Sequence, residues 1–305
     1  MDMNFSIGKG ADITVNYILD HFTPALDMIA AVIGFVTGGI QGGLLAIPAV
    51  VGIAILTLLS LWRVGWKFAI FTALALALVH HMGLWSGTME SLSLVLAATI
   101  IAIVIGIPLG IAMARSELLA SFIRPVLDLM QTMPAFVYLI PAAMFFGLGA
   151  VPGTIATVIF AMPPVVRLTN LGIRQVHGEF VEAGLAFGCT AKQLLFKVQI
   201  PNALPSIMAG INQTIMLSLS MVVIASMIGA GGLGNTVLTG IQRLDVGTGF
   251  EGGLAVVILA VVLDRITQSF GKPQPGLFRR FAALRKQPEA ETGAKKTTSL
   301  HKQEA

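Results

Sequence analysis

The chain has 305 residues, of which 55% are hydrophobic and only 11% are Asp, Glu, Lys or Arg. Soluble domains are roughly 25% charged, so this composition excludes an ordinary soluble domain and indicates an integral membrane protein. The formal net charge of +4 does not indicate nucleic-acid binding, because the basic residues are scattered between apolar runs instead of gathering with aromatic residues on one surface. We therefore expect a lipid bilayer, and no nucleic acid, around this chain.

The N-terminal segment, residues 1–43, is expected to be extracytoplasmic. It shows no basic region followed by an apolar core and a small-residue cleavage site, so we expect no removable signal peptide. Within it, the stretch from Pro24 to Gln41 is apolar and glycine-rich but carries Asp27, and it is either an interfacial helix or an additional span. We favour the interfacial helix because the charge pattern fits seven spans.

Residues 44–270 hold the apolar runs of a polytopic membrane domain. A spanning helix needs about 20 mostly apolar residues. With that length, the sequence predicts an all-α transmembrane bundle of about seven spans, at residues 44–62, 67–84, 92–114, 130–149, 153–172, 204–229 and 252–270.

The basic residues predict the orientation of these spans. If the N-terminus is outside, every Lys and Arg except Lys9 and Arg243 falls on the cytoplasmic side. This asymmetry is what the positive-inside rule requires of a correct topology. The basic C-terminal segment, residues 271–305, is then cytoplasmic, and its low content of large apolar residues predicts a disordered tail.

Ionisable residues inside the spans are few, which argues against a proton-coupled carrier. Asp128, Arg167 and Asp264 fall near predicted cytoplasmic ends. His80 and His81 approach an outer end, and adjacent helical residues point in different directions, so we interpret them as interfacial residues rather than as a metal site or proton relay. A secondary carrier or channel stays open as an alternative, and an intramembrane enzyme built on the two histidines ranks last.

One charged, amphipathic segment, residues 178–201, separates two apolar runs and is predicted to be cytoplasmic. Phe180, Ala183 and Phe187 fall at helical spacing on one face. Gly188 stands where a residue in the left-handed conformation would end that helix. The pattern predicts a helix, a glycine corner and a second helix, and we call this segment the knuckle.

The second helix of the knuckle has its own start signal. Thr190 and Gln193 form a Thr-x-x-Gln capping box, and Pro201 is expected to end the helix. A loop that merely connects two spans is the alternative interpretation. If the segment instead binds a partner, small residues keep its surface low and two aromatic residues offer apolar anchors; these are Ala183, Gly184 and Gly188, and Phe180 and Phe187.

The knuckle resembles the Glu-Ala-Ala motif of ABC importer permeases, in which Gly follows after three residues and Ile-x-Leu-Pro after nine more. This chain has Gly184 for the second alanine, Val198 for isoleucine and Ile200 for leucine. In that family the motif is the coupling helix, which docks on a separate ATPase subunit. The resemblance therefore implies a coupling role for Glu182, Ala183, Gly184, Gly188 and Pro201, to which we add Phe180 and Phe187 as anchors.

A wider resemblance covers about Leu94 to Thr267. Stretches such as "MQTMPAFVYLIPAAMFFGLG" and "IMAGINQTIMLSLSMVVIASMIGAGGLG" are similar to the permease of glycine betaine/proline betaine (quaternary amine) uptake systems. The resemblance implies a type I ABC importer permease fold in the bacterial inner membrane, a homodimer of this chain, ATPase subunits and an extracytoplasmic substrate-binding protein. It also implies import of glycine betaine, proline betaine, choline or a related compound, with another small solute such as an amino acid as the rival.

The sequence contains no phosphate-binding loop with its lysine and hydroxyl. The glycine-rich stretch from Gly229 to Gly234 lacks both, and we interpret it as a turn or re-entrant corner. We therefore expect no covalent chemistry and no cofactor on this chain, and we expect ATP and Mg on a partner ATPase. The outer loop with Arg243, Asp245 and Glu251 is a candidate dock for the binding protein, although solvated loop charges are the preferred interpretation.

The span at residues 130–149 is a candidate wall of the solute path. Its prolines, Pro134 and Pro141, each remove a backbone hydrogen bond and are expected to kink the helix. An aromatic face without fixed positive charge would let a quaternary ammonium pass by cation–π contact, although aromatic residues at helical spacing are more often packing. The candidate lining residues are Met133, Pro134, Phe136, Tyr138, Phe145 and Phe146.

Overall fold

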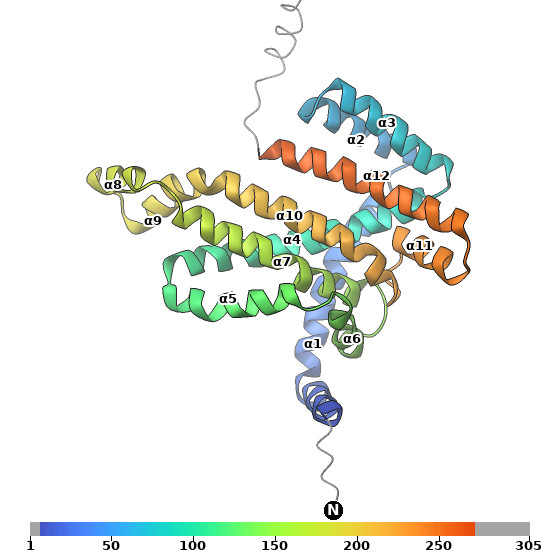
Figure 1. The fold of residues 1–305 in the computed structure, drawn as a ribbon, viewed down its shortest axis with the longest axis horizontal. Coiled ribbons are helices and arrows are strands. Elements are labelled where there is room, and N and C mark those ends of the chain that lie inside the picture. The colour runs from blue at the N-terminus through green and yellow to red at the C-terminus, as the bar shows by residue number, and fades with distance from the viewer. Residues whose placement is uncertain (1–6, 272–305) are drawn as a thin grey trace, which may run out of the picture. The chain divides into compact units, whose positions relative to one another are not determined.

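The computed structural model describes residues 7–271, and every regular element within them is a helix (Figure 1). The all-α class predicted from the sequence is confirmed. The predicted tail lies outside the described residues from Lys272 on. The elements are α1 (Ile7–Leu45), α2 (Ala49–Arg63), α3 (Trp66–His81), α4 (Trp85–Arg115), α5 (Glu117–Thr132), α6 (Phe136–Phe146), α7 (Ala150–Arg174), α8 (Gly178–Ala186), α9 (Ala191–Leu194), a π-helical turn η1 (Leu195–Gln199), α10 (Ile200–Ser226), α11 (Leu233–Gln242) and α12 (Val246–Phe270).

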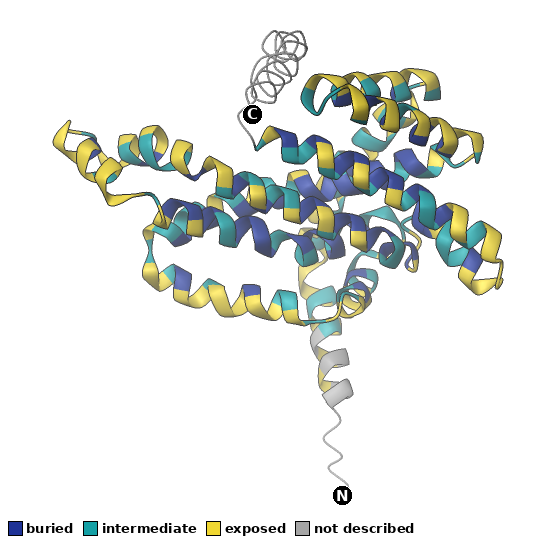
Figure 2. Cartoon of the chain, turned by 45° about the horizontal axis from the view of Figure 1, so that its top comes forward, coloured by how far each residue is buried: buried dark blue, intermediate teal, exposed yellow. Residues whose placement is uncertain are grey.

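Helix α7 forms the centre of the fold and packs between α4 and α10. Glycines let these helices approach closely, because a side chain in their place would collide with the neighbouring helix. A Cβ on Gly106 of α4 would lie 2.6 Å from the Val165 side chain, and one on Gly210 of α10 would lie 3.0 Å from its Cα. Close approach at small residues is a common way for membrane helices to associate. Figure 2 shows buried residues concentrated along this part of the bundle.

The bundle has two ends, which the short helices mark. Helices α8 and α9 protrude at one of them, which we call the knuckle end (Figure 1). At the opposite end, the Gly149 N–H before α7 donates to the Ile228 carbonyl after α10, at 2.8 Å. The ends of α4 and α7 at Arg115 and Arg174 lie at the knuckle end, whereas Arg243 follows α11 at the opposite end.

A second layer forms on one side of this centre. Helix α12 packs on α10 and α11, and the hairpin of α2 and α3 packs on α12. Arg63 fastens the hairpin, because its guanidinium donates to the Ser269 carbonyl at 2.9 Å and lies 4.0 Å from the centre of the Phe270 ring. This cation–π contact and hydrogen bond hold the end of α2 against the end of α12.

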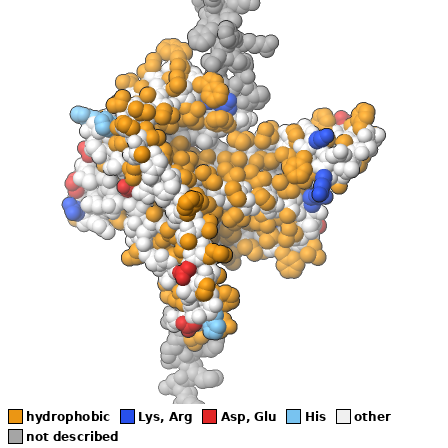
Figure 3. All heavy atoms as spheres, turned by 180° about the vertical axis from the view of Figure 1, so that it is seen from behind, with side chains coloured by type: hydrophobic (Ala, Val, Ile, Leu, Met, Phe, Trp, Pro, Cys, Tyr) orange, Lys and Arg blue, Asp and Glu red, His pale blue; other side chains and the backbone are white. Residues whose placement is uncertain are grey.

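Two of the predicted spans, residues 44–62 and 67–84, correspond to helices that are shorter than expected. Helices α2 and α3 have 15 and 16 residues, which gives about 22–24 Å at 1.5 Å per residue and falls short of the roughly 30 Å apolar core of a bilayer. The described residues hold five helices of spanning length, or six if α5 and α6 form one broken span. Figure 3 shows the largely apolar surface that such helices present. Three predicted spans fall within helices of spanning length, namely residues 92–114, 153–172 and 252–270. The predicted span at residues 204–229 begins inside another such helix and runs three residues past its end at Ser226.

Helix α1 contains the ambiguous stretch from Pro24 to Gln41, and the predicted boundary after residue 43 falls inside the helix. Its segment Val15–Leu45 is long and apolar enough to span a membrane, yet it is almost unburied. Figures 1 and 2 show α1 crossing the direction that α4, α7 and α10 share. It meets the bundle at the end opposite the knuckle, where Gly34 lies beside Val151. The interfacial interpretation of this helix stays a prediction.

The predicted span at residues 130–149 is wrong as drawn. In its place two helices, α5 and α6, meet at a bend of 101°. The break falls between Thr132 and Phe136, around Pro134, whereas Pro141 lies inside α6 without interrupting it. The Tyr138 hydroxyl donates to the Met130 carbonyl at 2.8 Å and braces the bend. Proline thus breaks this helix instead of merely kinking it.

The glycine-rich stretch between α10 and α11 is a turn, as predicted. Two residues of α4 hold it, because Glu90 accepts a hydrogen bond from the Gly232 N–H and Ser91 accepts one from the Leu233 N–H, both at 2.8 Å. Helix α4 thereby caps the start of α11. Three glycines of the turn have positive φ, at +83° for Gly229, +80° for Gly231 and +74° for Gly232.

Candidate functional site

The knuckle has the local structure that its sequence predicts. Helix α8 ends before Gly188, whose φ is +78°, and the Cys189 N–H closes the corner on the Gly184 carbonyl at 3.0 Å. The capping box is present in both directions, since Thr190 and Gln193 each accept a hydrogen bond from the other's backbone N–H. The helix, corner and helix predicted for this segment are confirmed.

The second helix of the knuckle does not end at Pro201. It passes through η1 and continues as α10, with Pro201 in its first turn. Proline has no N–H to donate to the carbonyl four residues earlier. In the turn just before it, the Ile200 N–H donates to the Leu195 carbonyl, five residues earlier, which makes η1 π-helical. The Asn202 side chain supplies another donor, to the Val198 carbonyl at 2.7 Å. The knuckle is therefore joined without a loop to a helix of the bundle.

Gly184 faces the interior of the knuckle, where α8 packs against α9. It is the buried residue of α8, and a Cβ on it would lie 2.7 Å from Cδ1 of Leu194 in α9. The expectation that Gly184 keeps the outer surface low is therefore wrong. Ala183 and Gly188 are exposed, and a Cβ on Gly188 would meet no atom within 4 Å.

The outer surface of the knuckle is apolar and unusually open. Phe187 is 89% exposed and Phe180 is 50% exposed, so both predicted anchors point away from the protein's own core. Leu185 and Phe196 are also exposed. Glu182 is exposed on the same short helix. An exposed apolar surface of this kind indicates an interaction site, because proteins without a binding partner rarely expose large apolar patches to water.

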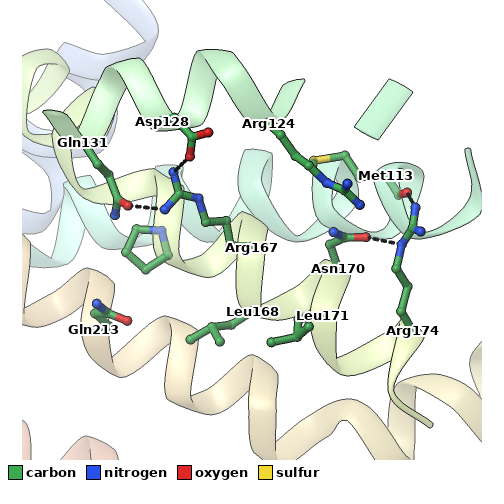
Figure 4. A pocket seen from close by; sticks show the side chains of 11 residues that line it. Met113, Arg124, Asp128, Gln131, Arg167, Leu168, Asn170, Leu171, Arg174 and Gln213 are labelled. Atoms are coloured by element: carbon green, nitrogen blue, oxygen red, sulfur yellow. Dashed lines mark hydrogen bonds and ion pairs between the residues drawn. The ribbon is translucent and has the colours of Figure 1, made fainter. Parts of the chain in front are cut away.

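A second candidate site is a groove of about 560 Å³ between α5, α7 and α10, in the half of the bundle near the knuckle (Figure 4). Arg167 of α7 donates to Asp128 of α5 at 2.6 Å and to Gln131 of α5 at 2.5 Å. Gln213 enters from α10. We call this site the polar groove; its lining residues are Met113, Arg124, Asp128, Gln131, Pro164, Arg167, Leu168, Asn170, Leu171, Arg174 and Gln213.

Arg174 closes the knuckle end of the polar groove. Its guanidinium donates to Asn170 at 2.9 Å and to the Met113 carbonyl at 2.7 Å, and it pairs with Glu117 at the start of α5. It thus joins the ends of α4, α5 and α7. Arg124 forms a longer ion pair of 3.4 Å with Glu117, and both side chains are about half exposed or more.

The six residues predicted to line the solute path do not line the polar groove. Phe136 is exposed, and Tyr138 packs against a buried cluster of α6, α7 and α10. The sequence does not reveal the groove, because Asp128 and Arg167 each resemble an isolated charge near a helix end. Their signal was the recurrence of polar residues on α5, at Arg124, Asp128 and Gln131, at helical spacing.

The structure offers no candidate metal site among its described residues. His80 and His81 end α3, and the His80 ring contacts Trp85 edge to face, with ring centres 6.3 Å apart. In the candidate dock, Asp245 accepts hydrogen bonds from the Thr248 N–H at 3.2 Å and from the Thr248 hydroxyl at 2.7 Å, and so caps α12. Asp245 therefore has a structural role.

Comparison with known proteins identifies the family of this chain. Residues 106–272 match the family described as "Binding-protein-dependent transport system inner membrane component". The chain belongs to this family. It is a multi-pass permease of the inner membrane, a transport subunit rather than an enzyme, and it works with an ABC ATPase and a substrate-binding protein.

Relatives of this permease cover most of its length. It is 50% identical over 259 residues to the glycine betaine/proline betaine transport system permease protein ProW of Escherichia coli (strain K12), covering 85% of this chain and 73% of ProW. It is 52% identical over 258 residues to the glycine betaine/carnitine transport permease protein GbuB of Listeria monocytogenes serotype 1/2a (strain 10403S), covering 83% and 92%.

A solved structure supports the fold of the permease. An inward-facing structure of the MetNI methionine ABC transporter matches with a TM-score of 0.53 at 23% sequence identity, over 62% of this chain and 92% of that one. At this identity the match concerns the fold alone. The helical bundle is therefore that of an ABC importer permease.

Proposed function

We propose that this permease imports glycine betaine and related quaternary amines. The observation that carries the substrate class is the identity of about half over most of the chain to permeases named for glycine betaine, proline betaine and carnitine. Each of these solutes joins a quaternary ammonium to a carboxylate. Import of another solute, such as an amino acid, is the outcome that would overturn the proposal.

The knuckle is the part of the permease that docks on the ATPase and couples ATP hydrolysis to movement of the bundle. Its support is structural, because Phe187 and Phe180 present an open apolar surface and η1 joins α9 to α10 without a loop. A push on α8 and α9 is therefore transmitted directly to a helix that packs on α7. ATP and Mg bind on the partner ATPase. The other residues of the knuckle that serve coupling, by contacting the ATPase or by shaping the knuckle, are Glu182, Ala183, Gly188 and Pro201.

Docking on an ATPase sets the orientation of the bundle. ATP is available in the cytoplasm, so the knuckle end is cytoplasmic and the end with α11 is extracytoplasmic. The basic residues support this assignment, because Arg115, Arg174 and Lys192 lie at the knuckle end. Two copies of the permease form a homodimer around the path, because one copy leaves the charged polar groove open along its side.

The test is ATP hydrolysis by the reconstituted complex of permease, ATPase and binding protein. Binding protein loaded with glycine betaine should raise the hydrolysis rate severalfold over the unloaded protein. Stimulation by a different ligand alone, such as an amino acid, would refute the substrate class and keep the permease. A purified permease that retains no ATPase subunit would refute the coupling role of the knuckle.

A further inference from the structure

The polar groove differs from the apolar surface beside it. On the side of α5 that faces away from the groove, Leu118 and Phe122 are 71% and 70% exposed. On the opposite side of the same helix, Arg124 and Asp128 line the groove (Figure 4). Helix α5 thus has an apolar side suited to lipid or protein and a charged side that is not.

Arg167 of the groove lies inside α7, a helix long and apolar enough to span a membrane. Arg167 lies seven residues before Arg174, the last residue of α7, which is about 10 Å along the helix at 1.5 Å per residue. Ionised side chains in membrane-spanning segments face the protein interior or a water-filled cavity, because exposure to hydrocarbon is costly. The groove therefore faces water or protein, and not lipid.

Arg124 and Arg167 retain unused hydrogen-bond donors. A guanidinium has five N–H donors. Within residues 7–271, Arg167 donates only to Asp128 and Gln131, and Arg124 forms only its 3.4 Å ion pair with Glu117. Arg174 differs, because all three of its nitrogens already have partners. Arg124 and Arg167 can therefore also bind the anionic group of a solute.

The charge balance of the groove distinguishes between solutes. Three guanidinium groups, those of Arg124, Arg167 and Arg174, face two carboxylates, those of Glu117 and Asp128. The excess is one positive charge. Such a site repels a monocation and accepts a neutral zwitterion, whose carboxylate binds an arginine while its ammonium group lies near a carboxylate.

We propose that the polar groove is the cytoplasmic part of the solute path, and that its arginines favour solutes that join a carboxylate to their ammonium group over solutes that carry ammonium alone. The proposal rests on the proposed function of the permease and adds a specificity site to it. Asp128 and Arg167 then act on the solute as well as on each other. Arg174 acts as a positioning residue, because its contacts are all within the protein.

The experiment measures water access and electrostatic potential in the groove of the assembled complex. Cys189 is the single cysteine of the chain, so Cys189→Ala provides a permease without thiols, and labelling is measured on the permease band of the complex. Gln213→Cys places a thiol in the groove, and Val257→Cys places one on the exposed apolar side of α12 as the control. Each variant is treated with two methanethiosulfonates, one with a trimethylammonium group and one with a sulfonate, and the labelling rates are measured.

The proposal predicts three results. Both reagents label Gln213→Cys at least tenfold faster than Val257→Cys. Adding Arg124→Gln lowers the sulfonate-to-ammonium rate ratio at Gln213→Cys at least threefold, because a positive charge is lost. Adding Arg243→Gln, at the other end of the bundle, leaves the ratio unchanged, and comparison of ratios at one site cancels the intrinsic reactivity of the reagents.

Other results overturn the proposal. If Gln213→Cys is labelled no faster than Val257→Cys, the groove is not part of a water-filled path. If Arg124→Gln leaves the ratio unchanged in a variant that still co-purifies with the ATPase, the arginines do not select by charge. The unlabelled complex is assayed separately for hydrolysis stimulated by betaine-loaded binding protein, so failure of the proposed function is distinguished from failure of the groove.

Discussion

The guanidinium of Arg167 on α7 lies 2.6 Å from the carboxylate of Asp128 on α5. Few buried side chains hold α5 in place, with Ala120 and Leu127 the fully buried ones. The ion pair therefore links the broken span to the central helix of the fold. Because it also lines the polar groove, one contact serves both the position of α5 and the potential of the groove.

Replacing Arg167 by Gln removes this ion pair and keeps an amide near Gln131. The two charged side chains are 37% and 66% exposed, so solvent screens the pair, and we expect a loss of at most about 1 kcal/mol. The Tm of the purified permease should fall by roughly 2–4 °C. Arg167→Glu places two carboxylates together and should lower the Tm further. Equal Tm values for both variants would contradict an ion pair that stabilises the fold.

Gly188 is predicted to set the angle between α8 and α9. Its φ of +78° costs a residue with a side chain roughly 1–2 kcal/mol. Gly188→Val should leave the permease in the membrane but uncouple ATP hydrolysis from uptake. Gly178→Val is the control, because a Cβ there also meets no atom within 4 Å and the backbone is helical. Normal uptake and normal ligand-stimulated hydrolysis in Gly188→Val would contradict the coupling role of the knuckle.

The close approach of Gly184 to Leu194 leaves no room for a side chain at position 184. Gly184→Val should reduce uptake, because the new side chain collides with Cδ1 of Leu194 inside the knuckle. Leu194→Ala removes that atom, so the double variant should recover at least half of the lost uptake. Contacting residues show interaction energies of about 0.5–3 kcal/mol in such cycles. Strictly additive losses would indicate that Gly184 contacts a partner instead.

Gly234 lies where α11 crosses close to α10. A Cβ there would lie 2.3 Å from the Val222 carbonyl oxygen, a backbone atom that cannot move aside without shifting α10. Gly234→Ala should therefore cost roughly 1–3 kcal/mol or more and lower the amount of folded permease in the membrane. Gly253→Ala, where no atom lies within 4 Å, is the control. Equal amounts of folded protein from the two variants would contradict the close approach.

The hydrogen bonds of Asp245, at the end of the bundle opposite the knuckle, predict a pH dependence of stability. Hydrogen bonds from Thr248 lower the pKa of the Asp245 carboxyl below its ordinary value of 3.8. Because the folded-state pKa is the lower one, the cap stabilises the fold above pH 3.8 and the contribution is lost as the pH falls through the folded-state pKa. The Tm difference between the native protein and Asp245→Ala should thus be constant from pH 7 to about 5 and shrink in more acidic buffer. A difference that grows on acidification contradicts this account.

The knuckle could be predicted from the sequence because its signals are local. Gly188 needs only a left-handed backbone, and the capping box joins residues three apart, Thr190 and Gln193. The continuation through Pro201 could not be predicted in this way. Proline in the first turn of a helix and proline after the end of one give similar sequence patterns, and the π-helical hydrogen bond that joins them is visible only in three dimensions.

The polar groove depends on pairs that are distant in the sequence. Asp128 and Arg167 are 39 residues apart, and each alone looks like a charge near a helix end. The charges of α5 also lower its hydropathy, so the sequence predicts a span that starts at residue 130, whereas the helix begins at Glu117. The family resemblance, in contrast, rests on a long stretch of matching residues and needed no tertiary contact.

The most direct test of the central claim is uptake of radiolabelled glycine betaine into proteoliposomes that contain the permease, its ATPase and its binding protein. The account predicts uptake that requires ATP and ligand-binding protein, and that continues when the ion gradient is abolished. Uptake that survives ATP depletion and collapses with the ion gradient would contradict it, because the protein would then be a secondary carrier.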